Sequence, residues 1–216
     1  MKSLKGEDSY INIMNFTNIR VFFSKTGNAK YISHLDLYRA MGRAIKRSAL
    51  PVWITEGFNP HIYMTFALPL ALGIESSGES VDLRLTHEIG FNEISERLNA
   101  VMPNGLDVIR TAAPILKADE IKKAEYEIES QPRTLKVIDE YLSRPKIKIT
   151  KKTKKNIQVI DVKPLLEWES GKVILPAGNA LNINPWNVFS GLDESETGDF
   201  KVKRTAILCE NGRIFA

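Results

Sequence analysis

The sequence has few of the side chains that hold metals or crosslink a chain. Of its 216 residues one is a cysteine, Cys209, and three are histidines, at positions 34, 61 and 87. A single cysteine excludes an intramolecular disulfide, and so few scattered Cys and His side chains predict neither a structural zinc site nor an iron–sulfur cluster. Cys209 lies in a strand pattern, and we expect it in the core.

Long apolar runs and phosphate-binding glycine loops are missing too. No run approaches the roughly 20 apolar residues that span a bilayer. Charged residues interrupt the first 16 positions, where a signal peptide would be apolar. We therefore expect a cytoplasmic protein with no membrane partner. Gly57, Gly73 and Gly78 are isolated, so nucleotide hydrolysis is not expected and no cofactor is predicted.

The charges are segregated along the chain, although the formal net charge is +4. Residues 20–61 carry seven Lys or Arg against two acidic residues, and residues 144–163 carry eight against one. Residues 75–102 compensate with an excess of four acidic residues. Such segregation is typical of a protein with one face directed at a polyanion.

Hydrophobic periodicity predicts an α+β protein with two units of similar element order. In the first unit we expect strands at 19–25, 51–55, 62–70, 81–85 and 106–115, and helices from Ser33 to Pro51 and over 91–102. In the second we expect strands at 124–129, on both sides of a basic turn at 151–156, at 171–178 and at 200–208, and helices at 132–142 and from Asn184-Pro185. The predicted fold is two tandem ferredoxin-like (β-α-β-β-α-β) units with antiparallel sheets, residues 1–118 and 119–216.

Two basic elements are candidates for RNA binding. The first helix places its cations opposite its apolar stripe, at a spacing that suits a phosphate backbone. A second cluster sits on the basic turn. The predicted RNA-binding residues are Lys25, Lys30, Arg39, Arg43, Lys46, Arg47, Lys151, Lys152, Lys154 and Lys155. The alternatives are a solvated helix face and a lysine-rich turn that aids solubility.

Two histidines lie near these basic elements. His34 and His61 are candidates for acid–base chemistry or for stacking on a base. The plainer interpretations are that His34 packs beside the Ser33 helix cap and that His61 holds its turn by hydrogen bonds. No catalytic residue is therefore assigned.

Short motifs in order over residues 20–110 resemble the radical-SAM-linked, or radical-SAM-associated, bacterial protein family of unknown function. They are Ser24-Lys25-Thr26-Gly27, the helix start Ser33-His34-Leu35-Asp36, the run Glu56-Gly57-Phe58-Asn59-Pro60-His61, and a turn from Pro69 to Ser76. The chain departs from the family's arginine-rich helix at Gly42 and Lys46.

The resemblance implies a partner of a radical-SAM enzyme with a cobalamin-binding-like domain, in a setting connected to ribosomes and RNA processing, and brings no known activity. We expect an RNA-binding accessory protein, without catalysis of its own, that presents a structured ribosomal or transfer RNA to that enzyme. One alternative is a metal-independent endoribonuclease using His34 or His61; tandem ferredoxin-like units look like the CRISPR repeat-processing endoribonucleases. The other is a protein-interaction adaptor for the radical-SAM enzyme that never contacts RNA.

Overall fold

The computed structural model describes residues 16–152, 157–193, 195 and 198–215. The helices are α1 (His34–Arg47), α2 (Phe91–Asn99), α3 (Pro132–Leu142) and α4 (Pro185–Phe189). The strands are β1 (Thr17–Lys25), β2 (Met64–Phe66), β3 (Glu75–Leu85), β4 (Leu106–Ala112), β5 (Ile121–Ser130), β6 (Lys148–Lys152), β7 (Ile157–Asp161), β8 (Glu167–Glu169), β9 (Lys172–Pro176) and β10 (Phe200–Cys209). The α+β class expected from the sequence is confirmed.

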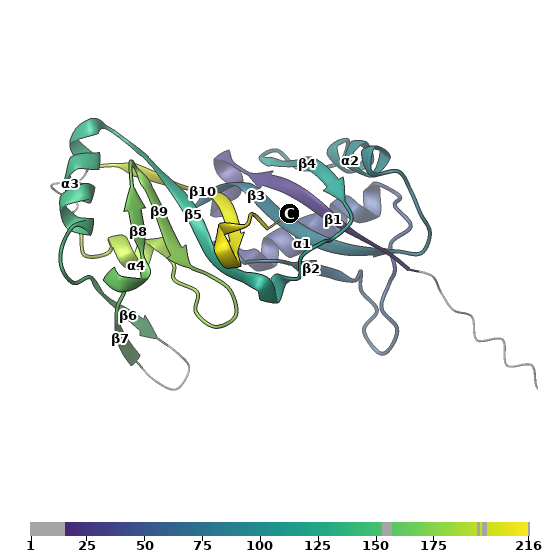
Figure 1. Ribbon diagram of the computed structural model, residues 1–216. Helices are drawn as coiled ribbons and strands as arrows, with labels where there is room; N and C mark the ends of the chain where they lie inside the picture. Colours follow the sequence, from purple (N-terminus) through teal and green to yellow (C-terminus); the bar gives the residue numbers. More distant parts are fainter. Residues whose placement is uncertain (1–15, 153–156, 194, 196–197, 216) are drawn as a thin grey trace, which may run out of the picture.

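One long sheet runs through both halves of the chain (Figure 1). Its strand order is β4-β1-β3-β10-β5-β9-β8, and β2 pairs with β3. The neighbours are antiparallel except for β3 and β10, which pair in parallel through Glu75 with Lys203 and Ser76 with Arg204. A single mixed sheet therefore stands where two antiparallel sheets were expected.

The parallel pair exists because β3 begins at Glu75, six residues before the strand expected at 81–85. Serine and glycine dominate residues 75–80, a composition typical of turns. Their side chains are nonetheless buried at Ser76, Glu79 and Ser80. Strand β10 offsets the cost of burying the Glu79 carboxylate, because Arg204 of β10 donates a hydrogen bond to it.

Two buried arginines connect the halves. Arg204 on β10 donates to Glu79 and to the carbonyl of Leu68. Arg20 on β1 donates to Asp82 at 2.6 Å and to the carbonyl of Leu116, and its guanidinium lies 4.1 Å from the centre of the Phe215 ring. Both contacts join residues far apart in the sequence.

Most local predictions are confirmed. Ser33 caps α1, since its Oγ accepts from the Asp36 amide at 3.1 Å. Helix α3 spans 132–142 as expected, and Asn184 caps α4 by accepting from the Trp186 amide. Cys209 is buried. No described helix is long and apolar enough to cross a membrane.

Helix α1 packs on one face of the sheet through its apolar stripe. Three alternate residues of β1, all fully buried, meet the α1 stripe in one core: Ile19, Val21 and Phe23 with Leu37, Met41 and Ile45. This packing turns the opposite, cationic side of α1 to the surface. A second core lies mainly in the second half but also includes Leu68 and Ile74 of the first half. It contains Tyr126, Ile138 and Tyr141, and the Tyr141 hydroxyl donates to the Val188 carbonyl.

The strands expected at 51–55 and 62–70 are shorter than predicted. Only isolated bridges form, Val52 with Leu85 and Ile54 with Ile62, before the three residues of β2. Between α1 and β2 the chain forms a loop that projects away from the sheet (Figure 1). Strand β8 was not anticipated from the sequence.

Candidate nucleic-acid interface

A groove forms between α1 and the chain that enters β2. We call it the α1 groove; its volume is about 280 Å³ and it is lined by Tyr38, Arg39, Gly42, Arg43, Lys46, Pro60, His61, Ile62 and Met64. A Cβ at Gly42 would lie 3.8 Å from the Met64 methyl, so a long side chain there would occupy the groove. Three of the predicted RNA-binding residues and His61 thus lie together.

The cations of the α1 groove are available to a ligand. Arg39, Arg43 and Lys46 lie on one helix face over about 10 Å, from a rise of 1.5 Å per residue. Arg39 pairs with Asp36 at 3.3 Å, but the two side chains are 58% and 56% exposed, and solvent weakens such surface pairs. Among the described residues neither Arg43 nor Lys46 forms a salt bridge, although Arg43 interacts weakly with the Asp36 carboxylate.

Arg47 and Asp36 have structural roles at the two ends of α1. Arg47 donates to the Val101 carbonyl at 2.7 Å, which ties the end of α1 to the end of α2. The hydrogen bond from the Ser33 hydroxyl, and then Arg39, hold the pKa of Asp36 below its usual value. Asp36 is therefore an anion at the helix N-terminus, where the helix dipole favours one.

His61 holds its turn by hydrogen bonds, as the sequence led us to expect. Its Nδ1 lies 2.9 Å from the Asn59 carbonyl oxygen and 3.0 Å from Thr55 Oγ1, and its amide donates to the same hydroxyl. A carbonyl can only accept, so Nδ1 carries the hydrogen and Nε2 of the neutral ring is the acceptor. His34 does not line the groove; its ring packs edge-on against Phe66 at 5.2 Å.

The loop at residues 55–61 presents an aromatic side chain to solvent. Phe58 has a relative exposure of 112%, the highest among the exposed large hydrophobic residues that the structure describes. Glu56, Gly57 and Asn59 are exposed beside it. Gly57 has φ of +109°, a left-handed conformation that favours glycine. The tip of the loop therefore consists of the motif residues themselves.

Lys25 and Lys30 are not at the groove. Lys25 is 1% exposed, and its ammonium donates to the Ile32 carbonyl at 3.1 Å. Burial lowers its pKa, while Glu79 opposes that decrease. Lys30 pairs with Glu75 at 3.3 Å in a largely buried contact. Their place is structural, and we leave both out of the interface proposed below.

The second basic cluster lies elsewhere on the molecule. Strands β6 and β7 form a separate two-stranded sheet in the half that holds α3, away from α1 (Figure 1). Lys151 is half-buried on β6 and Lys152 is in the same strand, while Lys154 and Lys155 lie outside the described residues. Ile157 and Val159 expose apolar side chains on β7.

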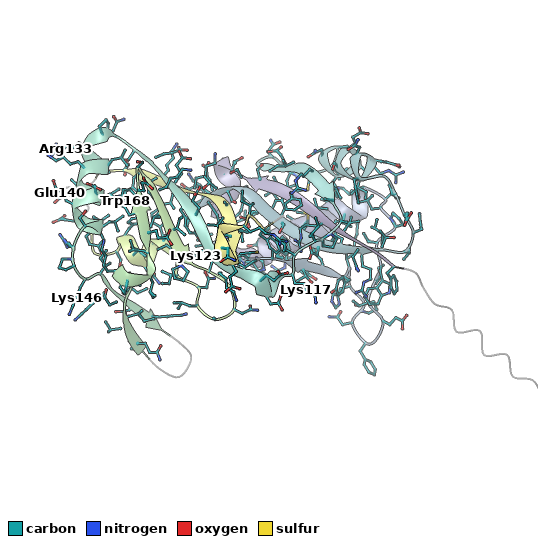
Figure 2. All side chains as sticks on the ribbon, in the orientation of Figure 1. Lys117, Lys123, Arg133, Glu140, Lys146 and Trp168 are labelled. Carbon is teal, nitrogen blue, oxygen red and sulfur yellow. The ribbon has the colours of Figure 1, made fainter. Side chains whose placement is uncertain are left out.

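The surface near the hairpin is also charged. Figure 2 shows Arg133, Glu140 and Lys146 on and after α3 at the outer end of the molecule, with Trp168 beside that helix. The Trp168 indole donates to Asp139 of α3 at 2.8 Å. The structure thus separates the two basic clusters that the sequence suggested as one RNA-binding set.

An arginine among three rings was missed at the sequence level. The Arg84 guanidinium lies 5.2, 5.0 and 4.5 Å from the ring centres of Phe16, Trp53 and Tyr63, and it donates to Asn18. The alternation of 81–85 would have placed Arg84 opposite the buried Leu83 and Leu85. Trp53 and Tyr63 flank the projecting loop, so this cluster fixes both ends of it.

The family comparison covers most of the chain. Residues 18–185 match the family described as an uncharacterized protein conserved in bacteria (DUF2344). The chain belongs to this family. The match spans the α1 groove, the projecting loop and the hairpin, so these features lie within the part that defines the DUF2344 family. A comparison with curated proteins gives no match.

Proposed function

We propose that this DUF2344 protein is an RNA-binding accessory protein whose α1 groove holds the phosphate backbone of a structured RNA. The observation that carries the proposal is the juxtaposition of Arg39, Arg43 and Lys46 with an apolar floor and a projecting loop. Two of these cations, Arg43 and Lys46, form no salt bridge among the described residues, so binding a phosphate breaks no close ion pair there. The apolar stripe of α1 fixes their register, which lowers the entropy lost on binding.

The proposal is tested by a groove variant with a charge-matched control. The groove variant carries Arg39→Gln, Arg43→Gln and Lys46→Gln; the control carries Lys122→Gln, Lys136→Gln and Lys201→Gln, three exposed lysines of the second half. Both lower the net charge equally. RNA affinity is measured at several salt concentrations. Loss of three phosphate contacts should reduce the slope of log affinity against log salt by about 2 for a single-stranded segment.

Equal affinity of the groove variant and the control would refute the groove assignment. Arg47 is kept in both proteins because its bond to Val101 is structural. Absence of salt-dependent RNA affinity in the wild type, together with binding to a protein partner that the groove variant retains, would favour the adaptor function.

The partner we propose is a radical-SAM enzyme, on the basis of the motif resemblance at residues 24–27, 33–36 and 57–61. The protein would hold the RNA while that enzyme modifies it. A ternary complex that loses RNA but keeps the enzyme in the groove variant would support this division of roles. An enzyme that binds RNA equally well without this protein would contradict it.

A second candidate function is a metal-independent endoribonuclease. It is favoured by His61, which lines the same groove as the cations and whose Nδ1 bonds to the Asn59 carbonyl, so that Nε2 is left for proton transfer. Cleavage of RNA by the purified protein in the presence of a chelator, lost in His61→Ala without loss of thermal stability, would establish it.

We also propose that the two halves are ferredoxin-like units. Support comes from the strand orders β4-β1-β3-β2 and β10-β5-β9-β8, in which each half has antiparallel neighbours. In the second half the β6–β7 hairpin is an insertion after α3. An experimental structure with other connections between these strands would overturn this description.

A further inference from the structure

The loop at residues 55–61 is held rigidly although its tip is exposed. The Thr55 amide donates to the His61 carbonyl at 2.8 Å, and Ile54 bridges to Ile62. The His61 ring closes the turn on Asn59, and the Trp53 and Tyr63 rings lie 5.6 Å apart at its base. The tip is therefore preorganised for contact.

None of the described residues shields Phe58 at that tip. Large aromatic side chains usually bury most of their surface in a folded protein, and this one has a relative exposure of 112%. It lies three residues from His61, so its Cα is within about 10 Å of the groove wall. A ligand in the α1 groove is thus within reach of the ring.

The charges around the ring define what it can contact. The groove beside the loop carries the cations Arg39, Arg43 and Lys46, which select a polyanion, whereas the loop itself carries the carboxylate of Glu56. A phosphate is therefore favoured at α1 and disfavoured at the tip. The flat uncharged ring of Phe58 suits the π-face of a nucleobase, and an unpaired base is the part of an RNA that offers one.

We propose that Phe58 stacks on an unpaired base of the RNA whose backbone lies in the α1 groove. The inference rests on the proposed function and narrows its substrate class to RNA with an unstacked base next to the bound backbone, as in a loop, bulge or end. The backbone contacts give affinity that depends on salt, and the stacking contact gives preference for unpaired over fully paired RNA.

The test compares Phe58→Ala, Phe58→Trp and a control, Ile115→Ala. Ile115 is 78% exposed in the connection between the halves, so the control also removes an exposed apolar side chain. The probes are a stem-loop RNA with a fluorescent adenine analogue in its loop and a blunt duplex of the same stem. Base–aromatic stacking predicts that Phe58→Ala binds the stem-loop about five- to 160-fold more weakly than the wild type does.

Three further results are expected. Phe58→Ala keeps the wild-type affinity for the duplex and the wild-type salt slope, because no charge is removed. Wild-type protein and Phe58→Trp quench the analogue, whereas Phe58→Ala does not. Ile115→Ala matches the wild type throughout.

Failure of this inference is distinct from failure of the proposed function. If Phe58→Ala binds the stem-loop as the wild type does while the groove variant loses it, stacking is refuted and the groove assignment stands. That result includes the case in which Phe58 docks on a protein. If the wild type shows no salt-dependent affinity for either probe, both proposals fall.

Discussion

The buried pair of Arg204 and Glu79 provides a test of how the two halves are joined. Their side chains are 1% and 3% exposed. The Arg204 Nε donates to Glu79 at 3.0 Å and its Nη2 donates to the same carboxylate at 2.5 and 2.6 Å. Nη2 also donates to the Leu68 carbonyl at 2.9 Å. Every one of these bonds crosses between residues of the first half and β10.

Removing one partner leaves a buried charge, which costs about 3–5 kcal/mol in such pairs. The two single variants should differ, because buried Lys25 also interacts with Glu79. Arg204→Met leaves Glu79 with one cation, whereas Glu79→Leu leaves two cations without an anion. We expect Glu79→Leu to lower the free energy of unfolding more than Arg204→Met. The double variant should recover part of the loss, since it removes both members of the pair.

Urea denaturation of the full chain measures these differences. The control is Arg97→Met, which breaks an exposed pair with Glu93 on α2 and should cost under about 1 kcal/mol. An Arg204→Met protein as stable as the control would refute the role of the pair. A double variant that loses more free energy of unfolding than the two single variants together would refute the coupling.

Three other predictions follow from individual contacts. The hydrogen bond from Thr205, and then Lys172, lower the pKa of Glu125 below its ordinary value of 4.5. The stability that these contacts give the protein is therefore present above pH 4.5 and is lost as the pH falls through the pKa of folded Glu125. Thr205→Val should cost about 1 kcal/mol of stability at neutral pH, and a loss of the same size in acid would contradict this. Ser33→Ala should cost about 1 kcal/mol in thermal unfolding by removing the α1 cap. Fragments 1–118 and 119–216 expressed apart should each be less stable than the whole chain in the same assay, because β10 then loses β3.

Local signals predicted the helices well. The Ser33 cap and the spacing of Leu37, Met41 and Ile45 set α1, and Pro132 set the start of α3, because caps, proline and periodicity act within a few residues. The exposure of the α1 cations followed from the same periodicity. The strand pattern before Cys209 likewise predicted its burial.

Contacts between distant residues could not be predicted in this way. Residues 75–80 form a strand through pairing with β1 and β10, and Arg204, 125 residues from Glu79, neutralises the carboxylate that this strand buries. Lys25 was assigned to RNA on its charge, but its place at the end of β1 buries it against the Ile32 carbonyl. The α1 groove depends on a loop that returns to the helix after residue 59. Sequence patterns within a few residues therefore could not predict the apolar floor of the groove.

The separation of the two basic clusters bears on which would contribute more to the RNA binding that we propose. The α1 cations stand on a helix whose buried stripe, including Met41 and Ile45, fixes their register, so few rotamers are lost on binding. The hairpin carries the larger local excess of charge, but β6 and β7 pair only with each other. Lysines on such a ribbon lose more conformational freedom for each phosphate bound. We therefore expect α1 to dominate affinity per contact and the hairpin to add a salt-sensitive increment at a distance. Because β3 and β10 hold the halves in one sheet, one RNA could contact both clusters only by extending along that sheet.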